Sequence, residues 1–134
     1  MEEYELKRAS MEKMRDNEID RRVVSILLSV GISANLQGYY FLKESIRMAI
    51  VDPMYIGSIT KTMYPKVASR YQTTACRVER AIRHAIDVSY NKGKIILLND
   101  IFGLNIYDER EKPTNAEFVA LIADRLSMDL QCVC

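Results

Sequence analysis

The stretch that most constrains the fold is PKVASRYQTTACRVERAIRHAIDVSY, residues 65–90. Proline suits the first position of a helix, so Pro65 predicts the start of a short one. The hydroxyl of Thr73 or Thr74 suits the cap of a second, longer helix that follows a three-residue turn. Two helices joined this tightly are typical of a helix-turn-helix. The sequence therefore predicts such a unit at about 65–91.

The packing of this unit is predicted by its small and apolar residues. Ala68 is small where the two helices must approach, and Val78, ten residues further on, is the apolar residue expected to meet it. Glycine is the easy residue for a left-handed turn, but Gln72 stands at that position. Gln72 therefore either weakens the match to the motif or indicates a slightly different turn.

The long helix is amphipathic when its residues are placed at about 100° steps. One arc is apolar and must pack on the domain; it contains Ala75, Val78, Ile82, Ala85, Ile86 and Ser89. The opposite arc carries Arg77, Arg80, Arg83, His84 and Asp87, with Glu79 at its edge. A basic helix face of this kind is typical of a helix that reads the major groove, although a charged helix on a helical bundle has the same pattern.

The chemistry of this face suits base reading. The arginine fork pairs with guanine, and a carboxylate accepts a hydrogen bond from cytosine. We therefore expect Arg77, Glu79 and Arg80 to lie at base edges, and His84, two turns from the helix start, to contact a base edge or the backbone. Glu79 has an alternative, an ion pair with Arg83 four residues along the same helix.

The charge distribution favours a nucleic-acid partner. The net charge of the chain is only +1, but residues 57–94 hold eight Lys or Arg against two Asp or Glu. A local basic block neutralises phosphates, while a solvated basic face with no partner is the alternative. The residues expected at phosphates from position alone are Ser58, Thr60, Lys61, Arg83 and Lys92. Helix capping is an equal alternative for Ser58.

Several other classes of protein are not favoured. No apolar run is long enough for a membrane span, and the acidic N-terminus lacks the core of a secretory signal, so a cytoplasmic, nucleoid-associated protein is expected. Cys76, Cys132 and Cys134 form neither a disulfide framework nor the tight paired spacing of structural zinc. His84 is the only histidine and no nucleophile is paired with it. We expect no enzyme activity, metal or cofactor.

The rest of the chain also has helical periodicity. We expect an all-α fold, a compact bundle of about six helices, over residues 16–130, with a charged tail, linker or frayed helix at 1–15 and a tail at 131–134. A capping box, Thr114 to Glu117, predicts the start of the last helix. The expected helices outside the central unit are Asp16 to about Gly31, Gly38–Val51, roughly Met54–Tyr64, Ile95–Phe102 (a strand being the alternative) and the one after Thr114.

Four strings carry a family resemblance: GYYFLKESI, GSITKTMYP, TTACRVERAIRHAI and KPTNAEFVALIADRL. They resemble the C-terminal effector domain of the stage-zero sporulation response regulator, the master regulator of endospore formation in Firmicutes, from about Ile19 to Leu126. The resemblance implies a six-helix DNA-binding domain that reads short promoter boxes, with two copies head to tail on tandem boxes. It implies base readers at Arg77, Glu79 and Arg80 with His84 nearby, phosphate contacts at Ser58, Thr60, Lys61 and Thr74, and a dimer contact at Phe118, Leu121 and Ala123.

The sequence also departs from the family pattern. Cys76 stands where the family usually has serine. Leu97 and Asn99 occupy places where the family has small polar residues thought to touch the sigma subunit of RNA polymerase, so that partner is less strongly implied than DNA. No receiver-domain pattern precedes Asp16, so we expect either an excised effector domain or a stand-alone paralogue. The alternative function is a receiver-less paralogue that pairs with a full-length regulator and modulates it.

Overall fold

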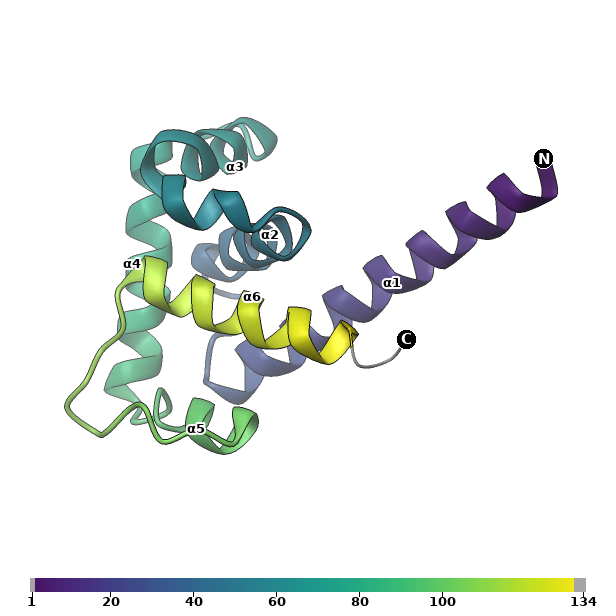
Figure 1. Ribbon diagram of the computed structural model, residues 1–134. Coiled ribbons are helices and arrows are strands. Elements are labelled where there is room, and N and C mark those ends of the chain that lie inside the picture. The colour runs from purple at the N-terminus through teal and green to yellow at the C-terminus, as the bar shows by residue number, and fades with distance from the viewer. Residues whose placement is uncertain (1, 132–134) are drawn as a thin grey trace.

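The computed structural model describes residues 2–131 and is all-helical there (Figure 1). Its α-helices are α1 (Glu2–Ser29), α2 (Gln37–Val51), α3 (Tyr64–Arg70), α4 (Ala75–Asn91), α5 (Leu97–Phe102) and α6 (Asn115–Gln131). A 3-10 helix, η1 (Pro53–Ser58), and a short π-helix, η2 (Ile59–Met63), connect α2 to α3. The predicted all-α class is confirmed, and the segment after Ile95 is a helix rather than a strand.

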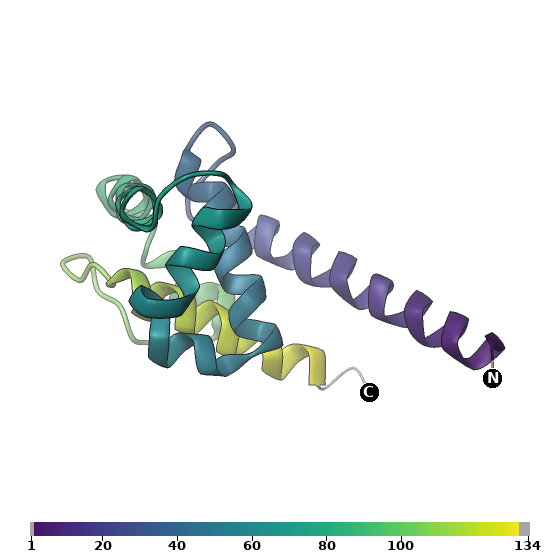
Figure 2. The same ribbon diagram turned by 90° about the horizontal axis from the view of Figure 1, so that it is seen from above.

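Helix α1 is longer than the sequence indicated. The helix begins at Glu2 rather than at Asp16, so of the alternatives given for residues 1–15 the structure shows the helical one. Its first half projects from the body with its described side chains exposed, so local helix-forming chemistry holds it rather than packing (Figures 1 and 2). Glutamates suit the positive end of a helix, and Arg8 pairs with Glu12 at 3.6 Å. Burial against the body begins at Ile19.

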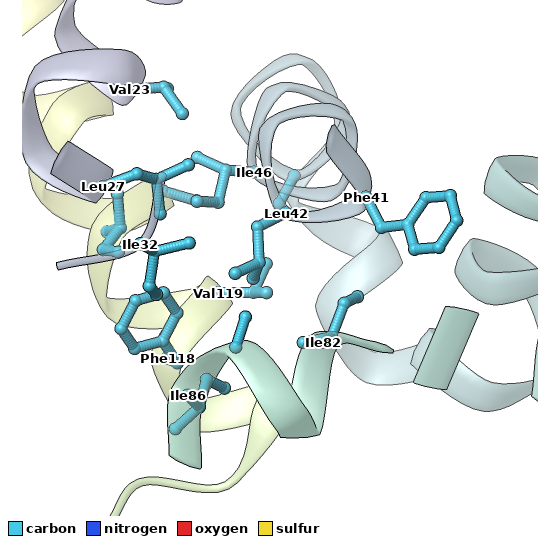
Figure 3. Packing of buried hydrophobic residues seen from close by; sticks show 14 of the residues in the cluster. Val23, Leu27, Ile32, Phe41, Leu42, Ile46, Ile82, Ile86, Phe118 and Val119 are labelled. Atoms are coloured by element: carbon cyan, nitrogen blue, oxygen red, sulfur yellow. The ribbon is translucent and has the colours of Figure 1, made fainter. Parts of the chain in front are cut away.

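The core is built around α2, which contacts α1, α4 and α6. Helix α4 lies at one edge of the body, and the N-terminal end of α1 points away from the opposite side (Figures 1 and 2). Figure 3 shows side chains from α1, α2, α4 and α6 meeting in one cluster. The largest fully buried side chains include Leu27, Ile32, Leu42, Ile46, Ile82, Ile86 and Phe118.

Gly38 sets the distance between α2 and α4. A Cβ at this position would lie 2.2 Å from the carbonyl oxygen of Ala81 and 2.7 Å from the Cβ of Ala85. Both distances are shorter than a van der Waals contact, so any side chain would push the two helices apart. The absence of a side chain at Gly38 therefore fixes how deeply α4 sits on the domain.

The turn between α3 and α4 ends α3 in a standard way. The amide of Thr73 donates to the Ala68 carbonyl at 2.9 Å, and the amide of Gln72 donates to the Ser69 carbonyl at 3.4 Å. These two bonds form the Schellman motif, in which the residue after the C-cap is left-handed, and Gln72 at that position has a φ of 53°. Glutamine thus occupies the left-handed position itself, so the turn needs no altered path.

The caps predicted from the sequence are present. The Thr74 hydroxyl accepts from the amide of Arg77 at 3.3 Å and starts α4. The Thr114 hydroxyl accepts from the amide of Glu117 at 3.1 Å, and the Glu117 carboxylate accepts from the amide of Thr114 at 3.4 Å. Ala68 and Val78 are both buried where α3 meets α4, as the spacing predicted.

Gly38→Ala is expected to lower the free energy of unfolding by about 1–3 kcal/mol, because overpacking forces backbone to move. Urea denaturation measures this change. Gly57→Ala is the matched control, since nothing lies within 4 Å of a Cβ at that position. Equal effects of the two substitutions would contradict the close approach of α2 to α4.

Gln72→Gly is expected to raise the free energy of unfolding by about 0.5–1 kcal/mol. Relief of the left-handed conformation is worth about 1–2 kcal/mol, and the added flexibility of the unfolded chain offsets part of it. Thermal unfolding would show the rise. Gln37→Gly removes the same side chain from helical backbone and should give no such gain; a loss of stability in Gln72→Gly would refute the argument.

Candidate nucleic-acid interface

Helix α4 has one buried and one uncovered face, as its sequence predicted. Val78, Ile82, Ala85, Ile86 and Ser89 are buried against the domain. On the other side Arg77, Arg80, Arg83 and His84 are exposed to solvent. Because the N-cap at Thr74 and the left-handed turn at Gln72 fix where α4 starts, these four side chains stay on the outer face.

Glu79 and Arg83 form an ion pair along α4. The Glu79 side chain is 26% exposed and that of Arg83 is 63% exposed, so the carboxylate lies closer to the body. This is the intrahelical pair that the spacing left open as an alternative to base reading. Within residues 2–131 the guanidinium groups of Arg77 and Arg80 form no ion pair. These two groups are available to a ligand without the loss of an internal contact.

Asn115 anchors α4 to its neighbours. Its side-chain amide donates to the Tyr64 hydroxyl and to the Glu79 carbonyl, both at 3.1 Å, so the start of α6 is joined to α3 and α4. Burial raises the pKa of Tyr64, so its hydroxyl remains protonated in this bridge. No sequence pattern singled out Asn115. It lies inside the capping box, but nothing in that motif indicates a contact 36 residues away.

Lys112 makes a second anchor near the far end of α4. Its ammonium lies 2.8 Å from the Asp87 carboxylate and 6.0 Å from the centre of the Tyr90 ring. The Tyr90 hydroxyl donates to the Arg110 carbonyl at 3.3 Å. The segment before α6 therefore runs along α4 and neutralises Asp87, which the sequence placed on the basic arc.

The residues predicted at phosphates do not all lie together. Thr60 and Arg83 line one hollow of about 460 Å³, which brings η2 beside α4, and Lys61 is exposed on η2. The Ser58 hydroxyl instead shares a hydrogen bond with Thr62 at 2.8 Å.

Thr74 and Lys92 mark the two ends of α4. Thr74 is exposed at the first turn. Lys92 lies at the other end of the helix, roughly 25 Å away, and its ammonium donates to the Gly31 carbonyl at 3.5 Å. Contacts by both residues would therefore fall on well-separated phosphates.

The residues predicted for a contact between copies differ in accessibility. Phe118 is fully buried beside Ile32 and Ile86 in the core (Figure 3). Ala123 is almost covered. Leu121 is half-buried and borders a hollow of about 680 Å³ between α6 and η1. A contact on this face would therefore be made by Leu121 and its exposed neighbours, because the Phe118 ring points inward.

Asn99 has a structural role at α5. Its side-chain amide donates to the Tyr107 carbonyl at 2.7 Å, and its oxygen accepts from the amides of Ile106 and Tyr107 at 3.0 and 3.1 Å. These bonds hold the loop after α5. They use the polar atoms of Asn99, the residue at the family position thought to touch the sigma subunit of polymerase.

Cys76 is exposed on α4, whereas Cys132 and Cys134 lie outside the described residues. No group of three His, Cys, Asp or Glu in residues 2–131 is arranged to hold a metal ion. None of the helices in this part of the chain combines the length and apolar character of a membrane span.

A helix-turn-helix with an uncovered basic second helix is typical of a DNA-binding domain. Comparison with known families supports this class, since a family model described as "Sporulation initiation factor Spo0A C terminal" matches residues 23–126. The chain belongs to this family. It is thus a DNA-binding transcription-regulator domain of sporulation, in a family of transcription factors rather than enzymes.

Proposed function

We propose that the domain reads short promoter boxes by placing α4 in the major groove. The observation that carries the proposal is the uncovered face of α4, where Arg77 and Arg80 form no internal ion pair. Arginine in the first turns of a recognition helix pairs with guanine O6 and N7. His84, one turn beyond Arg80, reaches the next bases or the flanking backbone. Glu79 reads cytosine only when Arg83 releases it.

The neighbouring polar residues supply affinity without sequence information. Thr74 is exposed at the start of α4 and Lys92 beyond its end, while Thr60 and Lys61 are exposed on η2, which lies beside α4. Contacts of this kind position the protein on the sugar-phosphate backbone, whereas base contacts specify the sequence. We place the protein in the cytoplasm at the nucleoid, where promoter DNA lies.

Two copies on tandem boxes would meet through the face around Leu121. Met54 and Val51 are exposed near this face, with Met128 on α6. The same apolar surface favours the second candidate function, a receiver-less paralogue that pairs with a full-length regulator. Sedimentation velocity of the chain mixed with a full-length regulator distinguishes the two functions. Only the second function requires a stable complex in the absence of DNA. Contact with the sigma subunit of polymerase would lie on α5, outside the side chain of Asn99.

Arg80→Ala is expected to weaken binding at a matched site by about 1–3 kcal/mol, because a base-reading fork is lost. Fluorescence anisotropy measures this on a duplex selected from a random pool and on a scrambled duplex at the same salt. The ratio of the two affinities should fall. An unchanged ratio would remove Arg80 from the reading face.

Lys61→Ala is the matched comparison for a phosphate contact. It should weaken the matched and scrambled duplexes alike and reduce the slope of log K against log salt by about 0.9. A loss confined to the matched duplex would contradict the role of Lys61. Arg8→Ala, on the projecting part of α1, removes an equal charge far from α4 and should change neither affinity.

A further inference from the structure

A groove lies between the start of α2 and the helix-turn-helix turn. Its volume is about 740 Å³, and Phe41 and Gln72 form part of its wall. Arg77 belongs both to this groove and to the uncovered face of α4, so the two surfaces are continuous. The remaining lining residues all carry side-chain hydrogen-bond donors: Gln37, Tyr40, Tyr71, Thr73 and Arg77. We call this hollow the donor groove.

The donor groove has no carboxylate in its lining. Four other hollows on the described part of the chain each include at least one acidic residue: Asp124, Glu79 with Asp87, Glu12, and Asp16. The acidic residue closest along α2 is Glu44, which pairs with Arg70 and is only 12% exposed. A surface with one cation, several neutral donors and no acid suits an anion that carries several acceptor oxygens.

Two tyrosines of the groove pack against other rings and still remain partly exposed. The Tyr71 ring packs edge-on against Phe41 with the ring centres 5.3 Å apart, and Tyr40 packs edge-on against Tyr39 at 5.1 Å. Tyr40 and Tyr71 nevertheless remain 42% and 43% exposed. Burial and the nearby Glu44 raise the pKa of Tyr71, so its hydroxyl is a donor at neutral pH. Rings fixed in this way lose little freedom when their hydroxyls bind a ligand.

We infer that the donor groove binds the phosphodiester backbone of DNA beside the major groove that α4 enters. Arg77 stands at the junction, so it contacts either the first base pair or the phosphate next to it. Gln37, Tyr40 and Tyr71 hold the strand that passes over the start of α2. The inference rests on the proposed reading of DNA by α4 and adds a clamp that α4 alone does not provide.

Gln37→Glu tests the groove without harm to the fold. A carboxylate at the first position of α2 favours the helix, so the melting temperature should stay the same or rise. Binding to matched and scrambled duplexes should both fall, by roughly fivefold to tenfold, because a negative charge would face phosphate. Ser10→Glu adds the same charge on exposed α1 and should leave both affinities unchanged.

The double substitution Tyr40→Phe and Tyr71→Phe keeps both rings and removes both hydroxyls. Affinity for either duplex should fall by roughly threefold for each hydroxyl, with no change in the salt slope, because no charge is lost. Phosphate-ethylation interference gives a direct readout. One or two phosphates whose ethylation blocks the wild-type protein should no longer matter to the variant. Tyr4→Phe, on an exposed ring at the end of α1, is the control.

The outcomes separate the groove from the proposed function. If the wild-type protein binds and Arg80→Ala loses discrimination, but Gln37→Glu and the tyrosine variant bind normally, the groove is refuted and the reading helix stands. If the wild-type protein binds no duplex, both are overturned. A loss of affinity in Gln37→Glu with an unchanged melting temperature and an altered ethylation pattern in the tyrosine variant establish the clamp.

Discussion

The close approach of α2 to α4 at Gly38 is the contact on which the interface depends. A helix has about 100° between successive residues, so a small rotation of α4 would bring Arg77 or Arg80 toward the core. Gly38 lets the backbone at Ala81 and Ala85 come so near that α4 is seated at one depth and in one orientation. The basic face is therefore outward because of a residue that carries no charge and lies on another helix.

Gly38 positions the middle of α4, and polar contacts position its two ends. At the start, the left-handed Gln72 and the cap at Thr74 set the first turn. Asn115 binds the backbone of the second turn, and Lys112 binds Asp87 nearer the end. Asn115 is the first residue of α6, and Lys112 lies just before it. The helix expected to meet a second copy is therefore also the one that holds α4 in place.

The sequence predicted what local chemistry decides. Periodicity indicated the buried arc of α4, and side-chain hydroxyls indicated a cap at Thr73 or Thr74 and another at Thr114. The start of α1 was not predicted, because its exposed half has no apolar face and forms from helix propensity and charge alone. Asn115 and the donor groove join segments distant in the chain, and no spacing rule gives such contacts. Two predictions for Phe118 differ: periodicity put it on the apolar stripe of the last helix, while the resemblance implied a dimer contact, and the side chain is buried in the core.

The ion pair of Glu79 with Arg83 is compatible with a role for each residue at DNA. An exposed pair four residues apart on a helix is worth only about 0.3–0.5 kcal/mol. A hydrogen bond to a charged group contributes about 1.5–3 kcal/mol, so a phosphate at this face would compete with Glu79 for Arg83. Release of Arg83 would then leave the Glu79 carboxylate without an ion-pair partner at the major groove of DNA, which is unfavourable unless a donor such as cytosine N4 is present. On the proposed reading of DNA by α4, the pair masks Glu79 in the absence of DNA, and the exposure of Glu79 depends on the sequence that α4 meets.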